Sequence, residues 1–379
     1  MYSPADPSQE NLEHAETEGL RSNTVLAVRR SLPGTVLLFL LLAIHATVAA
    51  HPILVPRPTA TLADRVLQSE SLVLAREDPA RPFHYAVTKI IAGKPDSTSI
   101  DTFMPSDIRR RLAADPSLAV LFTRSEGRDE WRSLGIASEA YLNTVRHILS
   151  FKGEWTPNET NNDARLHELS SLLGHEDVRL HELAYLEIGR ASYASIRKVG
   201  KDVPMQRVRA MMTMPVYFDW RGLDIMLLGL SAEEQDRARV LREMAERQAL
   251  AITINLAAWA TAYLEVTGTE GITQLETWYF KDKDRTREEI RLITRALAGH
   301  ANDNSELREP VVAAYLTMLD THPRTAPDIA HDLIAWQRWD LSERLQALRP
   351  TLARVDPLGV YKVNLYLQRA QSHNKAAQR

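Results

Sequence analysis

The sequence contains no cysteine. A chain without thiols cannot form disulfides, build a thiolate zinc site or an iron–sulfur cluster, or use a cysteine nucleophile. A lipoprotein anchor is excluded as well, because the lipid is attached to a cysteine at the cleavage site. Stability must therefore come from the apolar core, which 379 residues with 44% hydrophobic side chains can supply.

The sequence also has no large excess of positive or negative charge. The chain has 46 Lys and Arg against 49 Asp and Glu, a formal net charge of -3. This near balance gives no general electrostatic reason to expect a nucleic-acid partner. The 15 glycines and 19 prolines follow no strict period, which excludes a collagen-like or low-complexity fibre.

The longest apolar run, TVLLFLLLAIHATVAA at 35–50, lies near the start of the chain. It is shorter than the roughly 20 residues that a bilayer-spanning helix needs. Arg29 and Arg30 precede it and small residues end it, which is the pattern of a secretory signal peptide cleaved after Ala50. We therefore expect a signal peptide with an extended leader at 1–50 and a periplasmic or secreted mature protein. An uncleaved segment that anchors the protein in the inner membrane is the alternative.

Residues 60–150 contain short runs rich in β-branched and aromatic residues, separated by turn signals. The runs are SLVLA (71–75), FHYAVTKIIA (83–92), STSIDTF (97–103), LAVLFT (118–123) and WRSLGIA (131–137). Runs of this length and spacing predict strands and hairpins. We expect a small β-barrel or sandwich here, with helices at 105–114 and 138–149.

The polar, turn-rich stretch 151–162 is the expected domain linker. From 163 to about 350 apolar residues recur every three or four positions, the period of amphipathic helices. Paired helices in units of about 40–50 residues are typical of an α-solenoid, and an irregular helical bundle is the alternative. Residues 351–379 are expected to form a C-terminal helix and a polar tail. The predicted fold class is thus α+β, with a small β domain followed by an all-α array.

The segment LLGHEDVRLHELAYLEIGRASYASIRK (172–198) resembles a bacterial HEAT-type repeat. Three later segments, WRGLDIMLLGL, AAWATAYLEVTGTEGITQLE and DIAHDLIAWQRWDLSERL, resemble parts of exported bacterial HEAT-like proteins. This resemblance implies a HEAT-like binding scaffold over 163–350 and implies no catalytic activity.

The pieces SLVLAR, FHYAVTKIIAGKP and AVLFTR resemble the netrin-like domain of secreted proteins, which is an OB-type barrel. The resemblance implies a five-stranded barrel with a helix packed on its end. Netrin-like domains normally carry disulfides, and this sequence cannot form them.

Aromatic residues are spread through the helical half and are candidates for a binding groove. The candidate binding residues are Phe218, Trp220, Arg221, Trp259, Tyr263, Trp336 and Trp339. The alternative is that they pack in the core. Phe218 and Trp220 are the strongest candidates for exposure, because an Asp and an Arg alternate with them.

His51 would become the first residue of the mature chain after cleavage. Its α-amino group and imidazole could then chelate Cu²⁺ together, as in histidine-brace proteins, with His84 as a further ligand. The alternative is that a histidine stands first by coincidence. The cluster His167, His175 and His181 lacks the His-Glu-x-x-His spacing of a metalloprotease, so these histidines are predicted to be structural.

The sequence contains no Gly-x-Ser-x-Gly motif, phosphate loop or dinucleotide fingerprint. It favours a non-catalytic exported binding or scaffold protein, without cofactor, whose helical surface binds a protein or a cell-envelope component. Two alternatives remain open: an enzyme or copper-binding protein that uses His51, and a secreted inhibitor that acts through the β domain.

Overall fold

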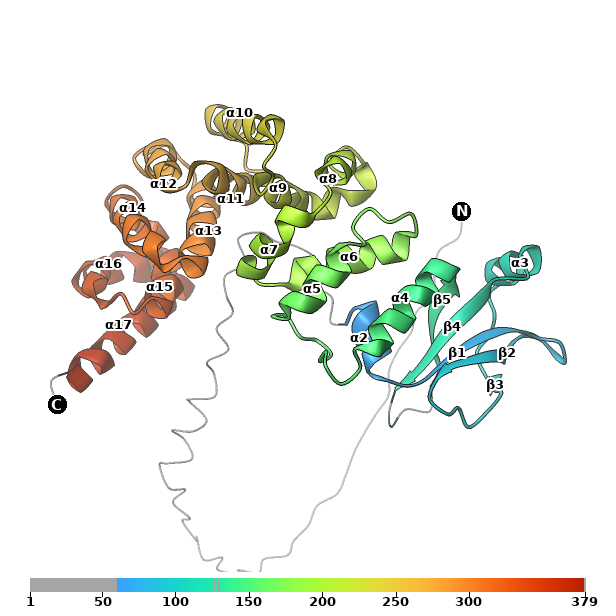
Figure 1. Cartoon of the computed structure of the whole chain (residues 1–379). Coiled ribbons are helices and arrows are strands. Elements are labelled where there is room, and N and C mark those ends of the chain that lie inside the picture. The colour runs from blue at the N-terminus through green and yellow to red at the C-terminus, as the bar shows by residue number, and fades with distance from the viewer. Residues whose placement is uncertain (1–59, 126, 128–129, 378–379) are drawn as a thin grey trace, which may run out of the picture. The chain divides into compact units, whose positions relative to one another are not determined.

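The fold is α+β, with an open antiparallel sheet near the N-terminal end of the described chain and helices after it (Figure 1). The computed structural model describes residues 60–377 except 126 and 128–129. These residues belong to one compact unit. The expected signal segment 1–50, with its cleavage site at Ala50, lies outside the described residues, as does His51.

The sheet has the strand order β3-β2-β1-β4-β5 and every pairing is antiparallel. Its strands are β1 (Ser69–Asp78), β2 (Arg81–Ala92), β3 (Ser99–Ile100), β4 (Ala119–Ser125) and β5 (Arg132–Ala137). All five predicted strands are present, although the run at 97–103 forms only the two-residue β3. The expected barrel or sandwich is wrong, because β3 and β5 are the two edges of a single open sheet.

Helices cover both faces of this sheet, which explains why it does not need to close. Successive residues of a strand point to opposite faces. Leu72 and Leu74 of β1 therefore join a core with α2 (Leu62–Leu67) and α4 (Glu139–Ser150). Val73 of β1 faces the other way and joins a core with α3 (Ser106–Ala114). The apolar side chains on each face of the sheet are thus buried by helices rather than by a second sheet.

From α5 onward the described chain is mainly helical, and most of its buried apolar residues share one extended core. Helices α9, α11, α13, α15 and α17 each contact the next in that order, while α10, α12, α14 and α16 pack beside them (Figure 1). The helices are α5 (Asp163–Ser170), α6 (Val178–Arg190), α7 (Tyr193–Val199), α8 (Met205–Met211), α9 (Arg221–Gly229), α10 (Glu234–Leu250), α11 (Leu256–Thr267), α12 (Thr269–Leu275), α13 (Arg287–Asp303), α14 (Arg308–Thr321), α15 (Ala326–Ala335), α16 (Ser342–Val355) and α17 (Pro357–Ala377).

The stretch 151–162, expected to link two domains, packs against the rest of the same compact unit. Trp155 is buried and its ring stacks on that of Phe151, with the centroids 4.1 Å apart. The core beneath α2 and α4 also continues across this stretch into α5 and α6, through Leu169 and Leu180. The sheet and the first helices therefore share apolar packing.

A buried group of four charged side chains joins the same parts. Asp64 of α2, Arg165 of α5, and Glu187 and Arg190 of α6 form this ion quartet. Arg165 Nη2 lies 2.8 Å from Asp64 Oδ1 and 2.8 Å from Glu187 Oε1. Arg190 reaches the other oxygens of the same two carboxylates, at 2.6 and 2.7 Å. Two positive and two negative groups thus neutralise each other away from water.

Further hydrogen bonds satisfy the carboxylates of the quartet. The hydroxyl of Thr61 donates to Glu187 at 2.6 Å, and the N–H groups of Thr61 and Asn158 each donate to Asp64 at 2.9 Å. Burial by itself raises the pKa of Asp64, but the hydrogen bonds from Arg190 and from these N–H groups outweigh burial and hold the pKa well below its usual range. Asp64 is therefore ionised throughout the physiological range.

We expect Arg165→Met to lower the free energy of unfolding by about 3–5 kcal/mol, because removing one partner leaves a buried charge uncompensated. Urea denaturation followed by circular dichroism measures the change. Arg146→Met is the matched control, since Arg146 lies exposed on α4 and, among the described residues, its Nη1 donates only to Asn143 Oδ1, at 2.9 Å. The control should shift stability by no more than about 0.5 kcal/mol. Equal effects of the two substitutions would contradict the role given to the quartet.

Candidate functional site

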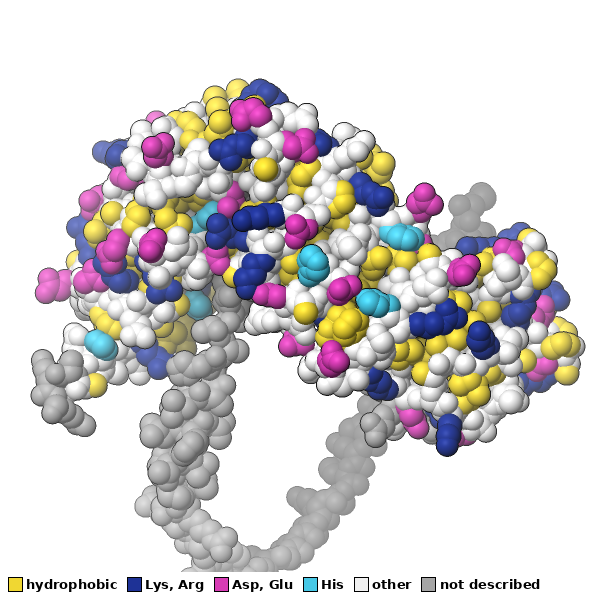
Figure 2. Space-filling view, in the orientation of Figure 1, with side chains coloured by type: hydrophobic (Ala, Val, Ile, Leu, Met, Phe, Trp, Pro, Cys, Tyr) yellow, Lys and Arg dark blue, Asp and Glu magenta, His cyan; other side chains and the backbone are white. Residues whose placement is uncertain are grey.

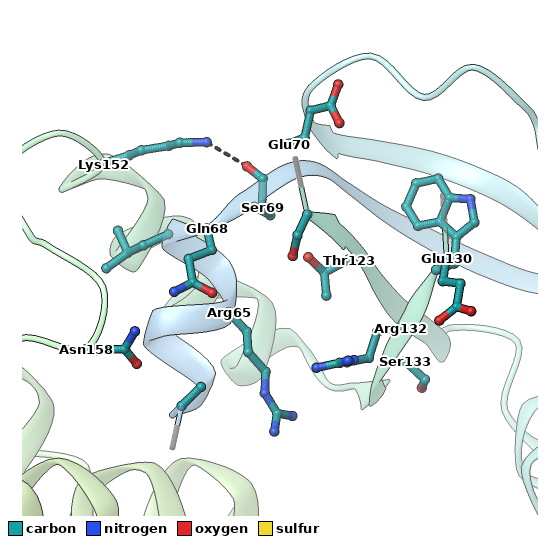
Figure 3. Close-up of a pocket in the computed structure, with 14 residues that line it drawn as sticks. Arg65, Gln68, Ser69, Glu70, Thr123, Glu130, Arg132, Ser133, Lys152 and Asn158 are labelled. Carbon is teal, nitrogen blue, oxygen red and sulfur yellow. Dashed lines mark hydrogen bonds between the residues drawn. The ribbon is translucent and has the colours of Figure 1, made fainter. Parts of the chain in front are cut away.

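A polar pocket of about 1060 Å³ opens beside α2 and the ends of β1, β4 and β5 (Figure 3). Arg65 enters it from α2, Thr123 from β4, Arg132 from β5, and Lys152 from the turn after α4. Figure 3 shows the side chains of Arg65 and Arg132 extending into the same open space. Side chains from four separate segments therefore converge on one cavity.

The strand pairing explains why the sheet is polar at this point. Leu74 of β1 lies opposite Leu121 of β4, and the next such pair toward the pocket is Leu72 with Thr123. Thr123 in turn lies opposite Arg132 of β5. The apolar row under α2 thus gives way to a polar row. In this row Thr123 is 3% exposed, whereas Arg132 is exposed at the pocket.

Among the described residues, the lining carries three cationic side chains, Arg65, Arg132 and Lys152, against two acidic ones, Glu70 and Glu130. The Lys152 ammonium group donates to the carbonyl oxygen of Ser69 at 2.7 Å, which holds it at the rim. The lining is therefore polar with a small positive excess.

The described lining of the pocket offers hydrogen-bond donors and acceptors. None of the described residues that line it is a histidine. Two of its serine hydroxyls make local hydrogen bonds, since Ser69 donates to the carbonyl oxygen of Val66 at 2.6 Å and Ser133 accepts from the N–H of Gly135 at 3.2 Å. A nucleophile needs a neighbouring base within hydrogen-bond reach. Ser69 and Ser133 thus have hydrogen-bond partners other than a side-chain base.

No group of three potential metal ligands occurs among the residues that the structure describes. His84 lies on β2, with its Nδ1 3.1 Å from the carbonyl oxygen of Pro82 and its Nε2 3.9 Å from Asp101. These contacts bring no second histidine to it. The copper prediction therefore depends on His51, which lies outside the described residues.

Three of the predicted groove residues are core residues instead. Trp259 and Tyr263 of α11 and Trp336, which caps the end of α15, are almost fully buried. The reason is that these side chains point toward packed neighbouring helices, and the indole of Trp336 donates to Asn302 at 2.7 Å. They offer no surface to a partner, so the prediction that they line a groove is corrected.

Trp339 is partly buried and lies apart from the remaining candidates. Its ring centroid is 5.7 Å from that of Tyr366 on α17. Arg221, at the start of α9, is likewise only partly exposed. Trp339 thus packs against the C-terminal helix α17.

Phe218 is exposed, and it lies in the 3₁₀ turn η2 (Pro215–Trp220). Tyr217, whose backbone angles depart from helical values, and Trp220 are both partly buried. Both contact Tyr185 of α6, with ring centroids 5.8 and 4.9 Å away. Anchoring these two rings turns Val216 and Phe218 outward, where they are 79% and 61% exposed.

Met214, just before the turn, is also exposed, and we call Met214, Val216 and Phe218 the apolar knuckle. Sequence reasoning found Phe218 but missed the other two. The apolar residues Met214 and Val216 on either side of Pro215 were the available signal. Figure 2 shows one face of the molecule, on which charged side chains are interspersed among apolar ones.

The aromatic residues that support the knuckle contact two buried ionisable side chains, Asp224 and His181. The hydroxyl of Tyr185 donates to Asp224 Oδ1 at 2.7 Å, and burial raises the pKa of Asp224 to about 7 although this hydrogen bond opposes the shift. His181 contacts Tyr217, and burial lowers its pKa to about 4. Its Nδ1 accepts from the N–H of Gly174 at 2.6 Å. This neutral histidine thus has the structural role predicted for it.

Asp177 and His175 are structural in the same sense. The Asp177 side chain caps α6 by accepting from the N–H of Arg179 at 3.1 Å, and the Asp177 N–H donates to His175 Nδ1 at 2.9 Å. These contacts stabilise the turn before the helix.

The raised pKa of Asp224 predicts a pH-dependent stability. Between about pH 4 and 7 the folded chain retains a proton that the unfolded chain releases, so this contribution is complete below pH 3.8 and is lost as the pH rises to about 7. Asp224→Asn removes it. The free energy of unfolding of wild type minus that of the variant should therefore fall from pH 4 to 7, measured by urea denaturation. Asp219→Asn, an exposed aspartate nearby, is the control, and identical pH profiles for the two variants would contradict the assignment.

No protein-family model, curated protein or solved structure matches this chain. Among the described helices, none combines the length and the apolar character that crossing a bilayer requires.

Proposed function

We propose that this chain is a non-catalytic exported binding or scaffold protein whose HEAT-like helical region binds a protein or a cell-envelope component. The observation that carries the proposal is the apolar knuckle of Met214, Val216 and Phe218, which is displayed on a buried aromatic base. Export rests on the signal-peptide pattern of residues 1–50, and membrane attachment would require that segment to stay uncleaved.

The arrangement of the helices supports a scaffold. Helices α9, α11, α13, α15 and α17 pack in series, and the intervening helices flank them. Stacked helix pairs produce packing of this kind. Such arrays bind partners through extended surfaces rather than through an enclosed catalytic site. The described residues also bring together no pairing of nucleophile and base in the polar pocket, which favours binding over catalysis.

The knuckle has the properties of a binding hot spot. Aromatic side chains dominate the energetics of protein interfaces, and burying an exposed Phe or Val contributes about 1.5–3 kcal/mol. Phe218 and Val216 are held outward by the packing of Tyr217 and Trp220 on Tyr185. Little conformational freedom is then lost on binding, which increases affinity.

Phe218 is the exposed aromatic side chain of the knuckle. The expected partner is therefore a protein with an apolar depression that accepts Phe218.

Photo-crosslinking tests this proposal. The photoreactive residue p-benzoylphenylalanine replaces Phe218 in the full chain, expressed in its own host, and the exported fraction is irradiated. We expect one discrete crosslinked partner, which excess wild-type protein displaces and excess Phe218→Ser protein displaces about 30-fold less well. Tyr361 on α17 is 70% exposed and is the matched control position. No crosslink at 218, or the same products from 218 and 361, would contradict the proposal.

A further inference from the structure

We propose that the polar pocket beside α2 is a binding site for a sugar phosphate, a second site that is independent of the knuckle. The pocket is lined by α2, the sheet ends and the turn after α4, whereas the knuckle belongs to the turn before α9. The inference therefore does not rest on the proposed protein-binding function.

The two arginines supply the anion recognition. In the part of the chain that the structure describes, neither Arg65 nor Arg132 has a carboxylate partner, in contrast to Arg165 and Arg190 of the ion quartet. Both extend into the same open space (Figure 3). Guanidinium groups bind phosphate oxygens through paired, charge-assisted hydrogen bonds. Two of them in one cavity fit a phosphate group.

Thr123 provides an independent indication of a ligand. It lines the pocket, it is 3% exposed, and its hydroxyl has no hydrogen-bond partner among the described residues. A buried hydroxyl without a partner costs about 1–3 kcal/mol. Figure 3 shows it on the same side of the sheet as Arg132. A ligand oxygen in the pocket would satisfy this hydroxyl next to the bound phosphate.

The remaining lining residues fit the neutral, hydroxyl-rich sugar part of the ligand rather than a second anionic group. The amides of Gln68 and Asn158 can both donate and accept, and the carboxylates of Glu70 and Glu130 can accept from hydroxyl groups. The same carboxylates repel a polyanion. A volume of about 1060 Å³ exceeds what a phosphate alone needs and accommodates a hexose phosphate with water.

Isothermal titration calorimetry of the full chain tests the proposal with three probes: glucose 6-phosphate, glucose and inorganic phosphate. We expect glucose 6-phosphate to bind once per chain and more tightly than the other two. Arg65→Gln and Arg132→Gln should each weaken it about 10–100-fold, the loss expected for a hydrogen bond to a charged group. Arg110→Gln is the matched control, because Arg110 is an exposed arginine on α3, which covers the opposite face of the sheet.

Thr123→Val separates a ligand contact from a structural role. Removing a hydroxyl that lacks a partner should leave the Tm of the free protein unchanged or higher, while the affinity for glucose 6-phosphate falls. Four results would overturn the proposal: no binding of glucose 6-phosphate, equal affinity for inorganic phosphate, equal weakening by Arg110→Gln, or a lowered Tm in Thr123→Val with unchanged affinity.

Discussion

The ion quartet of Asp64, Arg165, Glu187 and Arg190 is the interaction on which the other features depend. Removing four charges from water costs several kcal/mol per ion, and only complete pairing offsets this cost. Here each carboxylate contacts both guanidinium groups. The pairing is specific in space, because it requires α2 to lie against α5 and α6 in one arrangement.

Both candidate sites are built outward from this arrangement. On α2, Asp64 points into the quartet while the next residue, Arg65, lines the polar pocket. On α6, Glu187 belongs to the quartet while Tyr185, two residues earlier, supports the turn that displays Phe218. A helix that fixes one partner of the quartet thus also fixes a site residue. Disturbing the quartet should therefore affect the pocket and the base of the knuckle together.

The sequence was sufficient for the local structure. Short runs rich in β-branched and aromatic residues, such as 83–92, predicted strands. The recurrence of Leu166, Leu169 and Leu173 predicted helices, because this period reflects the burial of one face. Closure of the sheet was not predictable in this way. It depends on whether distant helices such as α3 and α4 cover the faces, and alternation within one strand contains no information about that.

The site residues show the same division. Phe218 and Trp259 are both aromatic residues in helical surroundings, yet one is exposed and the other is buried. Helix α11 is apolar nearly all round, so no polar face marks which side packs. The pairing of Asp64 with Arg165 spans 101 positions, and no short motif connects Arg65 with Arg132. Only the tertiary fold brings such residues together.

Native-state hydrogen exchange of the wild-type chain, followed by mass spectrometry at increasing low urea concentrations, tests the coupling most directly. If the quartet and the shared core join sheet and helices, peptides from β1 and β4 and peptides from α6 should reach the same free energy of opening. Exchange of the β1 and β4 peptides through a separate opening of lower free energy, with α6 still protected, would contradict the account.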